Sequence, residues 1–75
     1  MLHVEQKLWF IADEYADPAT AVGVLKGSGE GVVYWFLQAS KGSTRQDIIR
    51  WSGLHERTAE RAIKRLQDAG VILGR

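Results

Sequence analysis

From residue 44 to residue 73 the chain reads TRQDIIRWSGLHERTAERAIKRLQDAGVIL, and this stretch decides the fold. It predicts a short helix ending at about residue 51 or 52, a tight turn at Gly53 and a second helix over residues 56–69. At about 100° per residue, the second helix gathers apolar residues on one side and four cations on the other: Ala59, Ala62, Ile63 and Leu66 against Arg57, Arg61, Lys64 and Arg65. Such a helix packs its apolar stripe on its own domain and presents charge to a polyanion.

The charge of the chain is divided unevenly between its two halves. Residues 1–39 carry two basic and five acidic residues, whereas residues 40–75 carry eight basic and four acidic ones. The basic half coincides with the two-helix pattern, which favours a polyanionic partner on one face. The alternative is a solvated surface on which the charges segregate by chance.

The composition restricts the class of protein. Seventy-five residues make at most one small domain. The absence of cysteine excludes disulfides and thiolate metal sites, and no apolar run approaches the roughly 20 residues of a membrane span. Acidic and basic residues interrupt the N-terminal apolar residues, so no signal peptide is predicted and a cytoplasmic location is expected.

The inventory of reactive side chains argues against catalysis. There is no cysteine nucleophile and no convincing Ser-His-Asp arrangement, so we expect no catalytic residues. His3 and His55 are the only histidines, and no carboxylate cluster accompanies them. We therefore expect neither a metal site nor a cofactor.

The N-terminal segment is predicted to be helical over residues 2–15. Its apolar residues recur at three- and four-residue spacing, which also matches the a and d positions of a coiled coil: Val4, Leu8, Ile11 and Tyr15. Two heptads do not distinguish a helix packed on its own core from a dimer seam. Trp9 and Phe10 lie off this stripe and widen the apolar face, which keeps dimerisation open.

The middle of the chain contains several start and stop signals. Asp17-Pro18 predicts the start of a short helix over residues 19–26, with Gly27 just beyond its end. Residues 27–31 are interpreted as a linker rather than a phosphate-binding loop, because no Gly-Lys-Ser/Thr follows. Residues 32–37 have the composition of a strand, but the need to close a helical core favours a helix over residues 30–39.

Two further signals frame the helix pair. Ser43 and Gln46 form a capping-box pair for the next helix, with Thr44 over Asp47 as the alternative cap. Gly70 ends the last helix, and residues 71–73 read as a short strand. Trp35 and Trp51 are assigned to the core, with surface base stacking as the alternative.

Residues 43–73 resemble the winged helix-turn-helix domains of bacterial and archaeal regulators and of many replication proteins. The resemblance is carried by Gln-Asp-Ile-Ile at 46–49, Ser-Gly-Leu at 52–54, Arg-Thr-Ala-Glu-Arg-Ala-Ile-Lys-Arg-Leu at 57–66 and Ala-Gly-Val-Ile at 69–72. In this pattern Gly53 permits the positive φ of a sharp turn, and Leu54 packs between the two helices. Gly70 lets the chain turn into the first wing strand.

The resemblance implies a mostly α fold: a winged helix-turn-helix-like bundle with extra N-terminal helices and a short C-terminal strand. Residues 1–27 would form a helical extension for packing or dimerisation, and residues 28–75 the DNA-binding domain. Two features depart from the family pattern. His55 stands at the N-cap position usually held by Ser or Thr, and Glu56 and Glu60 place negative charge near the phosphates.

The resemblance also implies a set of contacts to double-stranded DNA. The second helix would enter the major groove, with His55, Arg57, Thr58 and Arg61 nearest the base edges. The other cations would meet phosphates: Lys41, Arg45, Lys64 and Arg65. Alternatively, Lys64 pairs with Glu60 on a solvated helix face.

The sequence stops where the second wing strand of the family is expected to begin. The chain is then either a domain of a longer protein or a domain without its wing. A transcription regulator or a replication-type protein is the expected setting. The alternative is a winged-helix module for protein contact or homodimerisation through the aromatic N-terminal helix.

Overall fold

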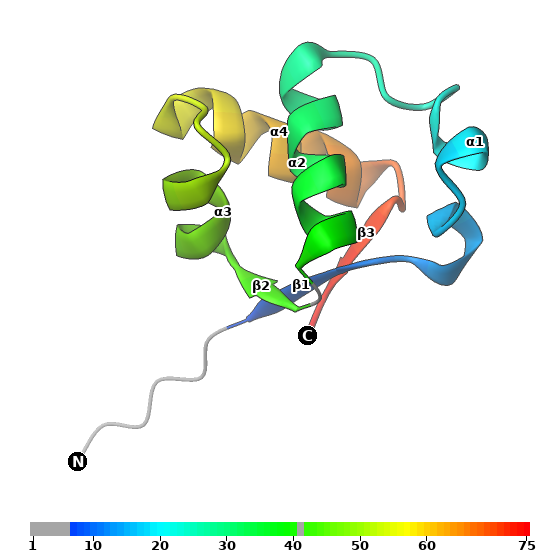
Figure 1. The fold of residues 1–75 in the computed structure, drawn as a ribbon, viewed down its shortest axis with the longest axis horizontal. Coiled ribbons are helices and arrows are strands. Elements are labelled where there is room, and N and C mark those ends of the chain that lie inside the picture. The colour runs from blue at the N-terminus through cyan, green and yellow to red at the C-terminus, as the bar shows by residue number, and fades with distance from the viewer. Residues whose placement is uncertain (1–6, 41) are drawn as a thin grey trace.

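Helices cover one side of a small sheet (Figure 1). The computed structural model describes residues 7–40 and 42–75. In chain order the elements are strand β1 (Leu8–Ile11), the 3-10 helix η1 (Asp13–Tyr15), α1 (Pro18–Ala21), α2 (Ser28–Ala39), β2 (Ser43–Thr44), α3 (Arg45–Trp51), α4 (Glu56–Asp68) and β3 (Ile72–Gly74). The predicted mostly helical fold with a short C-terminal strand is therefore confirmed. None of these helices is long and apolar enough to cross a membrane.

Strand β1, from the N-terminal segment, is the central strand of the sheet. The strand order is β2-β1-β3, and both pairings are antiparallel. Trp9 lies opposite Ser43 on one side and opposite Gly74 on the other. Beyond β3, Leu8 and Arg75 exchange two backbone hydrogen bonds, at 2.7 and 2.9 Å between nitrogen and oxygen. The two ends of the described chain therefore meet at one edge of the fold.

The N-terminal helix predicted over residues 2–15 is wrong where the structure describes this range. Of this range the structure describes residues 7–15, which form β1 and the single turn η1. Leu8-Trp9-Phe10-Ile11 alternates with the period of two that a half-buried strand requires, because Trp9 and Ile11 pack on the core while Leu8 and Phe10 face outward. A dimer seam on an N-terminal helix is accordingly not available.

The second correction concerns residues 19–31. The cap at Asp17 is confirmed, since its Oδ1 accepts the Ala19 N–H at 3.1 Å, but α1 ends at Ala21. Gly27 is the N-cap of α2 rather than the end of the preceding helix. Residues 28–31 form the first turn of α2, so their assignment to a linker is wrong, whereas the helical assignment of residues 32–37 is confirmed.

The helix pair at residues 45–68 follows its local signals closely. Thr44 Oγ1 accepts the Asp47 N–H at 3.1 Å, so the alternative cap is the correct one. Ser43 lies in β2 and its hydroxyl donates to the Ser40 carbonyl at 3.3 Å. Gly53 and Gly70 adopt φ of 79° and 78°, which only glycine adopts at low cost.

The hydrophobic core lies between the helices and the inner face of the sheet. Its largest fully buried side chains are Val33, Tyr34, Ile48, Leu66, Val71 and Ile72. The Tyr34 hydroxyl donates to the Tyr15 carbonyl at 2.5 Å and ties α2 to η1. Trp35 and Trp51 are 57% and 68% exposed, so their assignment to the core is wrong. Trp35 lies on the side of α2 opposite Val33 and Leu37, where neighbouring elements leave it uncovered.

The tryptophans provide a test of this packing. Trp9 is 6% exposed in the central strand, so Trp9→Ala removes a large buried ring and leaves a cavity. We expect a loss of about 3–5 kcal/mol in the free energy of unfolding. Trp35→Ala and Trp51→Ala are the matched controls, with expected changes within about 0.5 kcal/mol. Urea unfolding followed by far-UV circular dichroism measures all three, and equal losses would contradict the assignment of Trp9 to the core.

Candidate nucleic-acid interface

Helix α4 presents three cations on the side that faces away from the core. Its inward side is buried through Ala59, Ala62, Ile63 and Leu66, as their spacing predicts. At about 100° per residue, the exposed cations Arg57, Arg61 and Lys64 lie opposite this stripe within an arc of about 60°. We call these three residues the outer ridge. None of them has a carboxylate within ion-pairing distance among residues 7–40 and 42–75.

The flank of α4 that faces α3 is acidic and is paired across the helices. Thr44 caps α3 and starts it at Arg45, whose guanidinium forms an ion pair with the Glu60 carboxylate on α4. Both side chains remain partly exposed to solvent. Arg45 therefore belongs to the predicted surface, but a protein carboxylate already neutralises part of its charge.

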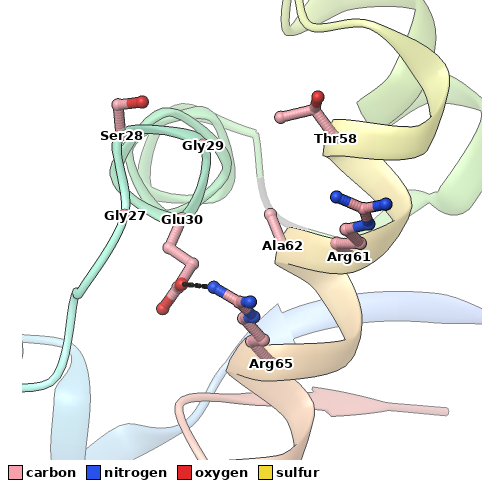
Figure 2. Close-up of a pocket in the computed structure, with 8 residues that line it drawn as sticks. All are labelled: Gly27, Ser28, Gly29, Glu30, Thr58, Arg61, Ala62 and Arg65. Atoms are coloured by element: carbon pink, nitrogen blue, oxygen red, sulfur yellow. Dashed lines mark ion pairs between the residues drawn. The ribbon is translucent and has the colours of Figure 1, made fainter.

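The opposite flank of α4 faces the N-terminal end of α2. There the Arg65 guanidinium lies 3.6 Å from the Glu30 carboxylate. Figure 2 marks this ion pair by a dashed line. The Glu30 side chain is 7% exposed and that of Arg65 is 69% exposed, so the pair joins a buried anion to a solvated cation. Glu30 Oε1 also accepts the Lys26 backbone N–H at 3.4 Å.

A hollow of about 200 Å³ separates the start of α2 from α4. It is lined by Gly27, by residues 28–30 of α2 and by Thr58, Arg61, Ala62 and Arg65 of α4 (Figure 2). The two helices approach closely because Gly29 has no side chain. A Cβ atom there would lie 3.1 Å from the Thr58 methyl carbon and 3.8 Å from the Ala62 Cβ.

Two residues predicted to read base edges have structural contacts as well. Thr58 is exposed, and its methyl group is turned toward Gly29, which leaves the hydroxyl for a ligand (Figure 2). His55 caps α4, and its Nδ1 faces the Arg57 backbone N–H at 3.4 Å. The histidine therefore occupies the N-cap position that the sequence assigns to it.

The structure places seven of the eight predicted residues on α3, α4 and the turn between these helices: Arg45, His55, Arg57, Thr58, Arg61, Lys64 and Arg65. Lys41, the eighth, lies outside the described residues. Sequence reasoning missed Glu30 and the hollow beside it. The available signal was an acidic residue in the first turn of a helix, where a carboxylate can accept backbone N–H groups, but this segment was interpreted as a linker.

The cations of this surface are chemically suited to anions. Guanidinium and ammonium groups donate charge-assisted hydrogen bonds to phosphate oxygens, and arginine can also form a bidentate fork with guanine. Within the part of the chain that the structure describes, no cluster of three His, Asp or Glu side chains is arranged to hold a metal ion. Comparison with known proteins found no matching family model, no similar curated protein and no similar solved structure.

Proposed function

We propose that this chain is a double-stranded DNA-binding domain of the winged helix-turn-helix type, of the kind used by transcription regulators and replication proteins. The observation that carries the proposal is the outer ridge. Arg57, Arg61 and Lys64 share one exposed side of α4, while the opposite side is buried in the core. A straight helix with a cationic side has the width and the charge to enter a major groove.

The order of the elements supports the same class. Helix α3, the turn at Gly53 and helix α4 follow one another directly, and β3 follows α4 after Gly70. A second wing strand would pair antiparallel with the strand that follows the recognition helix. Here β1 pairs antiparallel with β3, so the N-terminal segment supplies a strand in that position. In the proposed wing, β1 would take the place of the strand expected after residue 73.

The proposed binding mode divides the surface by distance from the N-terminus of α4. Arg57 and Arg61, with the hydroxyl of Thr58, approach the base edges, because the first turns of a recognition helix enter the groove. Lys64 meets a phosphate further along the helix. The phosphate contacts set affinity and register, and the arginines contribute the preference for sequence.

The salt dependence of duplex binding tests the recognition helix. The logarithm of the binding constant falls with the logarithm of the salt concentration, and each lost phosphate contact makes this negative slope shallower by about 0.9. We expect the variant with Arg57→Ala and Arg61→Ala to bind a random duplex at least tenfold more weakly, because two charge-assisted contacts are removed. The salt dependence of this variant also becomes shallower if the two arginines contact phosphates in addition to bases. Fluorescence anisotropy over a series of salt concentrations measures affinity and slope together.

The control for this variant removes two cations from outside α4. Lys7→Ala with Lys26→Ala changes the net charge equally, and both side chains are exposed. We expect this control to keep most of the affinity. Full affinity in the double arginine variant would refute the assignment of α4 as the recognition helix.

A second candidate function is homodimerisation through the outer face of the sheet. The described helices cover the inner face only (Figure 1). Leu8 and Leu73 are exposed on the other face, beside the half-buried Phe10. An uncovered group of apolar side chains is a common mark of a protein contact. In this homodimer the contact is made by the outer face of the sheet, whereas the sequence led us to expect a contact between N-terminal helices. It is compatible with DNA binding, because helix-turn-helix proteins often pair to read two half-sites.

Sedimentation analysis tests the homodimer. If the sheet face joins two copies, the mass rises toward twice the monomer between micromolar and millimolar concentration. Leu73→Lys should then restore the monomer, since it places a charge on the apolar contact. Trp35→Lys, at an exposed site on α2, is the control and should leave the mass unchanged. A monomer at every concentration would exclude the homodimer.

A further inference from the structure

Glu30 is the one acidic side chain that is buried among the described residues. A buried carboxylate is costly unless charges or hydrogen-bond donors compensate it. Glu30 has the Lys26 backbone N–H at 3.4 Å and the Arg65 guanidinium at 3.6 Å. A Cβ atom at Gly27 would lie 3.3 Å from its Oε2, so the carboxylate is folded back against the start of α2. Its surroundings fix the position of this anion.

Arg65 is the movable member of the pair. Its side chain is largely solvated, and it extends from α4 across the hollow to reach Glu30 (Figure 2). If Arg65 turned to a phosphate, it would leave Glu30 buried with one long hydrogen bond and no cation. Breaking a pair in this way is costly because the remaining buried charge is uncompensated.

Arg61 offers a direct comparison, because it lines the same hollow one turn earlier on α4. Among the residues that the structure describes, no carboxylate pairs with it. Arg45 differs again, since its partner Glu60 is partly exposed and can be hydrated when the pair opens. Of the three arginines, Arg65 is therefore the one held by a buried partner.

We propose that Glu30 is a positioning residue that retains Arg65 in an intramolecular ion pair and so keeps it from binding a DNA phosphate. The proposal rests on the proposed function, because it concerns the number of phosphates bound by the same surface. Glu30 limits sequence-independent affinity and thereby favours sites where Arg57 and Arg61 find their bases. A carboxylate on α2 thus adjusts the selectivity of α4.

The test measures the salt slope of duplex binding in four single variants and one double variant. Glu30→Gln keeps the shape of the side chain and removes its charge, so Arg65 is released to a phosphate. We expect the slope to steepen by about 0.9 and the affinity at low salt to rise about threefold to tenfold. Glu14→Gln, an equal charge change at an exposed site in η1, is the control and should change affinity less than twofold.

The two arginine variants measure the coupling. In the wild-type background we expect Arg65→Gln to leave the slope unchanged. Arg61→Gln makes the slope shallower by about 0.9 if Arg61 contacts a phosphate. In the Glu30→Gln background, Arg65→Gln should cancel the gain. Thermal melting of each variant reports whether the fold is kept, and Arg65→Gln in the wild type still tests the proposal if Glu30→Gln unfolds.

The possible outcomes are distinct. Equal slopes for Glu30→Gln and Glu14→Gln would overturn the role of Glu30. A shallower salt dependence for Arg65→Gln in the wild-type background would show that Arg65 already binds a phosphate, which also overturns the role of Glu30. No effect of Arg65→Gln in the Glu30→Gln background would show that Arg65 is not released, which overturns it as well. Absence of duplex binding by the wild-type protein would instead refute the proposed function itself.

Discussion

The close packing of α4 against α2 is the constraint on which the rest of the structure depends. Gly29 on α2 faces Thr58 and Ala62 on α4, and the absence or small size of these side chains lets the two helices approach. This approach buries Leu66 and Val33 in one core and fixes the direction of α4 relative to the sheet. Because apolar residues occupy the whole inward side of α4, its cations can lie only on the outward side and on the two flanks. The position of the charged surface is thus a consequence of the core.

The sequence was sufficient over most of residues 44–73, where the deciding signals are local. The stretch at residues 44–73 combines a threonine cap, two glycines with positive φ and an apolar stripe with helical period, and each of these acts within a few residues. They predicted α3, the turn, α4 and the final strand correctly. Segments whose partners are distant were less predictable. The spacing of Leu8, Ile11 and Tyr15 suits a helix, but β1 gains its hydrogen bonds from residues 43–44 and 72–75.

The same limit applies to the candidate site. The outward side of α4 follows from helical geometry, and the exposure of Arg57, Arg61 and Lys64 agrees with it. The pairing of Arg45 with Glu60 and of Arg65 with Glu30 joins different helices, and sequence spacing gives no measure of such distances. Cations that look equivalent along the sequence therefore have different surroundings. The misassigned tryptophans have a related cause, because a helix buries a residue only where a neighbouring element covers it.

The paired backbones of Leu8 and Arg75 have a consequence for how this domain joins other chains. Residues 8 and 75 lie side by side at the edge of the sheet, so the described part of the chain begins and ends at neighbouring points. A domain with adjacent entry and exit points fits into a surface loop of a host protein without separating the ends of that loop. A short peptide that joins residue 7 to residue 75 would likewise close the chain at low entropic cost, because it has only a short gap to span. Such a cyclic chain would keep every strand pairing of the sheet.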